Sequence, residues 1–125
     1  MKRPTGKQIR ESVKRWQHWL ALDHWQLTVR LGKIAGGYRA TCEADWEYRE
    51  ALLRFDPAAM VKHGDEIEEI VGHEVYHVVI WRTHTQIQAR AKTVKQEEDL
   101  CAIEEGECTH ASRAFLRLAR EARLI

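Results

Sequence analysis

The chain has 125 residues, with 20 lysines and arginines against 19 aspartates and glutamates, so its formal net charge is only +1. This length suits one domain, residues 1–125, with a single core, and the balanced charge gives no reason to expect nucleic acid as the principal partner. Charged residues throughout the first 15 positions and the lack of a long apolar run argue against a secretory signal and a membrane span, so we expect a cytoplasmic protein.

The first expected element is a helix from about Gly6 to Ala21. Thr5 and Gln8 have the spacing of a capping box. Apolar residues then recur at intervals of four, three and four, which predicts one buried helical stripe made of Ile9, Val13, Trp16 and Leu20.

Three strands are expected next. Alternating apolar residues predict a strand over Trp25–Leu31, and two more are predicted over Tyr38–Trp46 and Ala51–Phe55. Glu47–Glu50 is short and polar, so the last two strands should form an antiparallel hairpin, and Asp56-Pro57 should end the sheet.

Two helices are expected after the sheet. Asp65 and Glu68 have capping spacing before the proline-free run Glu66–Trp81. Arg82–Gln96 is a polar, basic connector, and Glu97–Arg123 is predicted to be a long helix. Its inward side chains are expected to be Leu100, Ile103, Ala111, Phe115 and Leu118. The chain should therefore have an α+β fold: a small antiparallel three-stranded sheet, an N-terminal helix, a motif-bearing helix and a long C-terminal helix.

The helix over Glu66–Trp81 carries the sequence His-Glu-Val-Tyr-His at residues 73–77. Histidines four residues apart project from one helix face about 6 Å apart, so both imidazoles can reach one zinc ion at about 2 Å. A catalytic zinc keeps an open position for water and lowers the water's pKa toward about 7. We therefore expect His73 and His77 as zinc ligands and Glu74 as the catalytic base.

The residues around the motif are apolar, which predicts a buried helix: Ile70, Val71, Val75, Val78, Val79 and Ile80. Two imidazoles and a carboxylate cost several kcal/mol in such surroundings unless they are paired or bind a metal. The alternative to a metal site is a core trio satisfied by other side chains.

A third ligand is expected on the C-terminal helix, where the candidates are Glu104, Glu105, Glu107 and His110. A metzincin would instead need a histidine six residues after His77 and a glycine three residues after it. Thr83 and Ile80 occupy those positions, so the metzincin pattern is absent.

A His-Glu-x-x-His helix followed by a helix with a glutamate ligand resembles the gluzincin metallopeptidases, and the small size and preceding sheet resemble minigluzincins and phage or ImmA-like peptidases. The resemblance covers roughly Trp25–Leu118. It implies Glu105 as the third ligand, because the small residues that follow match the family pattern: Cys108, Thr109, Ala111 and Ser112. Glu104 fits that pattern less well, and His110 would suit a SprT-like third histidine. Thr109 replaces the usual Asn or Asp that bonds to a ligand histidine.

The resemblance implies a zinc-dependent hydrolase of peptide or protein substrates, with Ala51–Phe55 or its neighbouring strand pairing with the substrate backbone. One alternative is a zinc-binding regulatory or interaction module, closed by a fourth ligand such as His84 or His110. The other is a SprT-like, nucleic-acid-associated protease that contacts DNA through a basic helix face, formed by Arg10, Lys14 and Arg15.

Three further sets of residues carry weaker expectations. The three cysteines, Cys42, Cys101 and Cys108, have no metal-binding or disulfide spacing and are expected to be ordinary buried thiols. Gly72 and Gly106 lie beside His73 and Glu105, so they are expected to allow close helix packing at the metal, unless Gly106 marks a break between two helices. The residues able to stabilise an oxyanion are Tyr38, Tyr48, Arg54 and His110.

Overall fold

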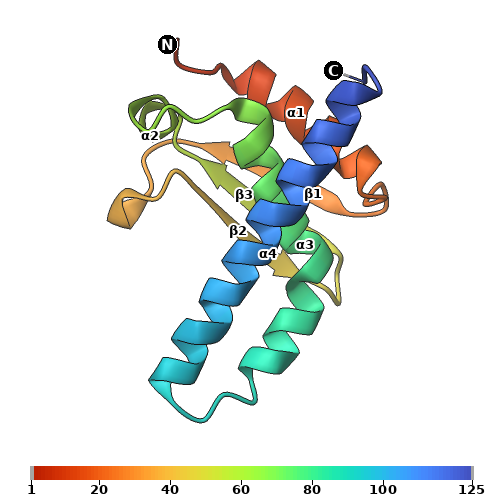
Figure 1. The fold of residues 1–125 in the computed structure, drawn as a ribbon. Helices are drawn as coiled ribbons and strands as arrows, with labels where there is room; N and C mark the ends of the chain where they lie inside the picture. The colour runs from red at the N-terminus through yellow and green to blue at the C-terminus, as the bar shows by residue number, and fades with distance from the viewer. Residues whose placement is uncertain (1, 125) are drawn as a thin grey trace.

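The computed structural model describes residues 2–124, in which the long helices lie on one side of a three-stranded sheet (Figure 1). The elements are, in chain order, α1 (Gly6–Trp19), β1 (Gln26–Leu31), the short 3₁₀ helix η1 (Ala35–Gly37), β2 (Ala40–Asp45), β3 (Glu50–Phe55), α2 (Pro57–Lys62), α3 (Ile67–Gln88) and α4 (Val94–Glu121). The predicted α+β class is confirmed. No helix in residues 2–124 is long and apolar enough to cross a membrane.

The sheet is mixed, so the expectation of a purely antiparallel sheet is wrong. Its strand order is β1-β3-β2, with β3 antiparallel to β2 and parallel to β1. The tight β2–β3 hairpin follows from the short polar connection. The longer connection over residues 32–39 places β2 one strand position away from β1. β3 then occupies the position between these two earlier strands.

The predicted capping box of α1 is present. The backbone N–H of Gln8 donates to Thr5 Oγ1 at 3.1 Å, and the backbone N–H of Thr5 donates to Gln8 Oε1 at 2.9 Å. These two bonds satisfy backbone groups at the start of the helix. The predicted apolar stripe is buried at Ile9, Val13 and Trp16.

The sheet ends at Asp56, as expected, but the next residues form an unpredicted helix, α2. The Asp56 side chain accepts a hydrogen bond from the backbone N–H of Ala59 at 3.1 Å, and Pro57 occupies the first turn. Both features favour a helix start.

The predicted cap at Asp65 is wrong. The residue that precedes α3 is Glu66, which makes no side-chain cap. Arg39 Nη1 instead donates to Asp65 Oδ1 at 2.6 Å, so the Asp65 carboxylate is used to tie the start of β2 to the start of α3.

The predicted connector Arg82–Gln96 is mostly helical. α3 continues to Gln88, and α4 begins at Val94, capped by the Thr93 side chain. No proline or glycine interrupts residues 82–88, and in Figure 1 the far ends of α3 and α4 form a helical hairpin that extends beyond the sheet. In this hairpin α3 and α4 are stabilised by their contacts with each other, because it lies beyond the central core.

The buried face of α4 differs in part from the prediction. Leu100, Ala111 and Phe115 are half-buried, whereas Ile103 and Leu118 are exposed. The fully packed stripe consists mainly of small residues, namely Cys108, Ser112, Leu116 and Ala119. Hydrophobic periodicity marks large apolar side chains, so it does not reveal such a stripe.

Gly72 lies where α3 packs against α1, not against α4 as expected. A Cβ atom on Gly72 would lie within 2.7 Å of three ring atoms of the buried Trp16. Gly106 lies inside a continuous α4, and a Cβ there would meet nothing within 4 Å. Gly106 therefore marks neither a helix break nor a close helix contact.

The two glycines give a matched stability test. Gly72→Ala should lower the free energy of unfolding by up to about 2 kcal/mol, because overpacking costs about 1–3 kcal/mol and the helix-propensity gain offsets only about 1 kcal/mol. Gly106→Ala should raise it by about 1 kcal/mol, since only the propensity term applies. Urea unfolding of both variants measures the difference. Equal stability of the two variants would contradict the assignment of Gly72 to the Trp16 contact.

Candidate metal centre

His73 and His77 lie on the same face of α3, one turn apart, with their rings together. Their Nε2 atoms are 3.2 Å apart, and the ring centroids are 4.9 Å apart. His77 is buried, and the His73 side chain is 18% exposed. The pair therefore lies at the boundary between the core and the solvent.

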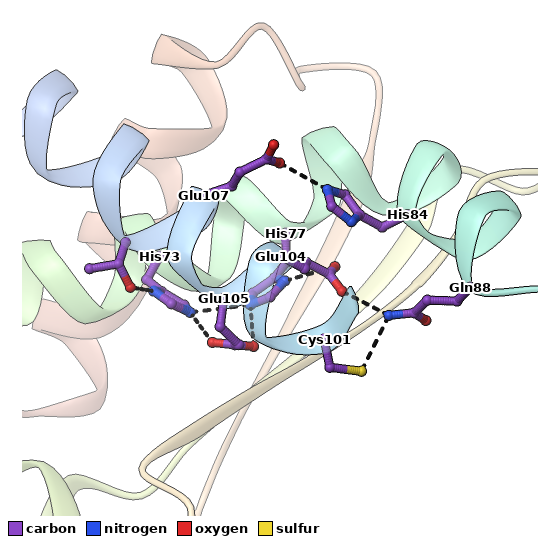
Figure 2. Close-up of polar contacts among 9 residues, drawn as sticks. His73, His77, His84, Gln88, Cys101, Glu104, Glu105 and Glu107 are labelled. Carbon is purple, nitrogen blue, oxygen red and sulfur yellow. Dashed lines mark hydrogen bonds and ion pairs between the residues drawn. The ribbon is translucent and has the colours of Figure 1, made fainter. Parts of the chain in front are cut away.

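Glu105 of α4 closes the third side of this pair (Figure 2). Its Oε2 is 2.8 Å from His73 Nε2, and its Oε1 is 3.1 Å from His77 Nε2. Glu104, the neighbouring residue, reaches the other ring nitrogen of His77 instead. Successive helix residues point about 100° apart, which is why these two glutamates approach the histidines differently.

These donor atoms lie close enough together to surround one metal ion. Ligand bonds of about 2.0–2.2 Å in tetrahedral geometry separate the ligand atoms by about 3.3 Å. The two Nε2 atoms and the Glu105 oxygens are separated by 2.8–3.2 Å. His73, His77 and Glu105 thus fit a metal ion of this size with small adjustments.

The Nδ1 atoms of both histidines have partners that orient the rings. Thr109 Oγ1 lies 3.1 Å from His73 Nδ1, and Glu104 Oε1 lies 3.3 Å from His77 Nδ1. Gln88 Nε2 in turn donates to Glu104 Oε2 at 3.3 Å. A proton on each Nδ1 leaves each Nε2 lone pair free for a metal. Thr109 is therefore the side chain that contacts the outer nitrogen of His73.

Cys108 is the residue at this centre that the sequence analysis missed. Its side chain is completely buried, and donor atoms of His73, His77 and Cys108 all lie within 4.8 Å of one another, so this group could hold a metal ion. The signal for it is positional: Cys108 follows Glu105 by three residues, so both face one side of α4.

The other two cysteines also differ from ordinary buried thiols. Cys42 is half-buried, Cys101 is exposed, and both line the cavity described next. All three thiols are free.

A cavity of about 850 Å³ opens onto the histidine pair between β2, α3 and α4. It is lined by His73, Glu74, His77 and Glu105, and by Arg39 and Arg113. Among the expected oxyanion stabilisers, Tyr38 lines this cavity, whereas His110 lines a neighbouring hollow. Tyr48 and Arg54 are exposed elsewhere.

The carboxyl groups of Glu74 and Glu105 have opposite pKa shifts. Burial raises the pKa of Glu74, against the opposing charges of His77 and His73. Hydrogen bonds from His73 and His77 hold the pKa of Glu105 well below its usual range. Carboxyls whose environments separate their pKa values often divide the roles of base and fixed anion.

The ring of His77 is held in its charged form when no metal is present. Burial acts to lower its pKa, but hydrogen bonds with Cys108 and Glu105 outweigh burial and raise the pKa to about 11. A metal must displace this proton, so binding competes with protonation. Burial also raises the pKa of the Cys108 thiol, although the bond to His77 opposes this.

The remaining ligand candidates are not brought to the histidine pair. Glu107 Oε2 lies 2.9 Å from Nε2 of the buried His84, further along α3. His110 is exposed on the side of α4 that carries Arg113 and Arg117. The structure thus brings Glu104, Glu105 and Cys108 to the pair and leaves Glu107, His84 and His110 away from it.

Comparisons with protein-family models, with curated proteins and with solved structures found no match to this chain.

Thr109 gives a test of ring orientation. Thr109→Val removes the hydroxyl near His73 Nδ1 at nearly constant volume, so zinc affinity should fall about 10- to 100-fold, the usual cost of losing a ligand-orienting partner. Thr109→Ser keeps a hydroxyl and should stay close to the wild type. Competition with a chromogenic chelator measures both dissociation constants. Equal affinity in the valine and serine variants would show that the hydroxyl does not orient His73.

Proposed function

We propose that this chain is a zinc metallopeptidase of gluzincin type, with His73, His77 and Glu105 as metal ligands and Glu74 as general base. The supporting observation is the cluster of two Nε2 atoms and one carboxylate separated by 2.8–3.2 Å, with a partner on each histidine Nδ1. Three free thiols suit a reducing compartment, and we assign the enzyme to the cytoplasm.

The side chains around the proposed zinc position can carry out the steps of peptide hydrolysis. Zinc at this position would supply a Lewis acid that lowers the pKa of a coordinated water toward about 7. Glu74, buried beside the histidines on the cavity wall, accepts a proton from the attacking water and passes it to the leaving amine. Its raised pKa suits this transfer in both directions.

Glu105 is preferred over its neighbours as third ligand because of distance. Its oxygens contact both Nε2 atoms, whereas Glu104 contacts Nδ1 of His77. Cys108 belongs to a looser group, within 4.8 Å of the histidine donors. The shorter distances support Glu105 as the third ligand in this proposal.

The strand that would pair with a substrate is β2. β3, which contains Ala51–Phe55, is paired on both sides, so its backbone is not available. β2 lies at the sheet edge, and Ala40, Thr41 and Cys42 of this strand line the cavity. An extended peptide added to this edge would pass the metal centre.

The second candidate function is a zinc-binding regulatory module without useful turnover. A closed site with four protein ligands favours such a role, and the buried Cys108 beside the pair is the observation that supports it. The SprT-like alternative lacks such support, since His110 lies away from the pair and Arg15 of the basic face is paired with Glu68.

Zinc binding tests the ligand set. Wild-type protein should hold close to one zinc per chain, and His73→Ala, His77→Ala and Glu105→Ala should each weaken binding far more than Glu107→Ala or His110→Ala. The loss should exceed the roughly 100-fold expected for a residue that only orients a ligand. Metal analysis and chelator competition give both quantities. A wild-type protein that takes up no zinc would refute the metal centre. If zinc affinity is lost in His110→Ala but unchanged in Glu105→Ala, the third ligand is His110 and not Glu105.

Hydrolysis tests the role of Glu74. Glu74→Gln should retain zinc and fold but lose peptide cleavage by at least about 100-fold, because an amide of the same shape cannot accept the proton. Cleavage of a mixed peptide library, read by mass spectrometry, compares the variant with the wild type. Undiminished cleavage by the variant rules out Glu74 as the base, and a zinc-loaded wild type that cleaves nothing favours the regulatory module.

A further inference from the structure

We propose that Cys108 is a fourth protein ligand of the metal, so that the resting protein has a closed set of two histidines, one glutamate and one cysteine. This inference rests on the proposed metal centre and concerns its regulation. It assigns a chemical role to a thiol that packing alone would leave inert.

Cys108 and Glu105 lie on the same face of α4 but differ in their exposure to solvent. Cys108 is 0% exposed and lies on the packed face of α4, whereas the Glu105 side chain is 60% exposed and reaches in from the solvent side. The two residues are one helical turn apart, so both can face the same ion without competing for the same space.

The distances allow thiolate ligation after a small movement. Zinc bonds of about 2.3 Å to sulfur and about 2.0 Å to nitrogen place these atoms about 3.5 Å apart in tetrahedral geometry. The donor atoms of His73, His77 and Cys108 all lie within 4.8 Å of one another. A side-chain shift on the order of 1 Å therefore completes the set.

A fourth protein ligand changes what the site can do. Four-coordinate zinc with four protein ligands has no position for water, as in structural sites, whereas catalytic sites keep one open. Cys108 binds as a thiolate, and its proton passes to solvent. Peptide hydrolysis then requires the thiolate to leave the metal, so Cys108 limits the fraction of the protein that is active at any time.

Cobalt substitution tests this inference without relying on turnover. Cobalt(II) loaded into the apoprotein gives a near-ultraviolet charge-transfer band when a thiolate is bound. The key variant is Cys42→Ser/Cys101→Ser, in which Cys108 is the one remaining cysteine. We expect the band in this double variant and in the wild type, and its loss in Cys108→Ser. Zinc affinity of Cys108→Ser should fall by at least about 100-fold, as for loss of a ligand.

The outcomes separate this inference from the proposed function. Cobalt bound by the double variant without the thiolate band overturns Cys108 ligation and leaves the three-ligand site intact. An unchanged zinc affinity in Cys108→Ser, with native circular dichroism, also overturns it. A thiolate band in a protein whose Glu74→Gln variant cleaves peptides normally would keep Cys108 as a ligand and refute the catalytic proposal. Failure to bind either metal refutes both.

Discussion

The interior position of α3 is the constraint on which the rest of the structure depends. α1, the sheet and α4 all pack against this helix, and Val71, Val75 and Val78 are completely buried. Ionisable groups in such a helix are costly unless they have partners. His77 and Glu74 are nonetheless buried in its middle. The fold must therefore bring polar partners to one particular stretch of α3, and α4 is the element that does so.

The contact between α3 and α4 combines close packing with polar pairing. Where α4 passes the histidines, its side chains form hydrogen bonds with them. Beyond this stretch the buried side chains of α4 are mostly small, which lets the two helices approach closely. Each hydrogen bond to a charged group contributes about 1.5–3 kcal/mol. A metal bound to the folded state alone would add to this stability by mass action. The same contact thus serves both folding and chemistry.

Local patterns in the sequence were enough to predict α1, the three strands, the first part of α3, most of α4 and the histidine pair, because capping, alternation and the four-residue spacing act between near neighbours. They could not predict the pairing of β1 with β3, since strand order depends on a connection whose path is not encoded in strand periodicity. The length of α3 was underestimated for a related reason: beyond Trp81 the helix packs mainly on α4, so its apolar stripe fades while the helix continues. The prediction that Ile103 and Leu118 face inward was wrong because these residues are large and apolar yet exposed.

Cys108 shows why the metal centre could be predicted only in part. In sequence it is one small residue among several on α4, and free cysteines commonly behave as small buried apolar groups. The chemistry of Cys108 depends on Glu105 facing the histidines. Cys108 follows Glu105 by one helical turn, so the same orientation of α4 brings Cys108 to the inner side of the centre. The centre therefore has an exposed carboxylate on the cavity side and a buried thiol on the core side. Solvent reaches the carboxylate directly, whereas the thiol lies inside the packed contact between α3 and α4. A shift of either helix would therefore move the thiol relative to the histidines, so the contact that builds the candidate site also controls its geometry.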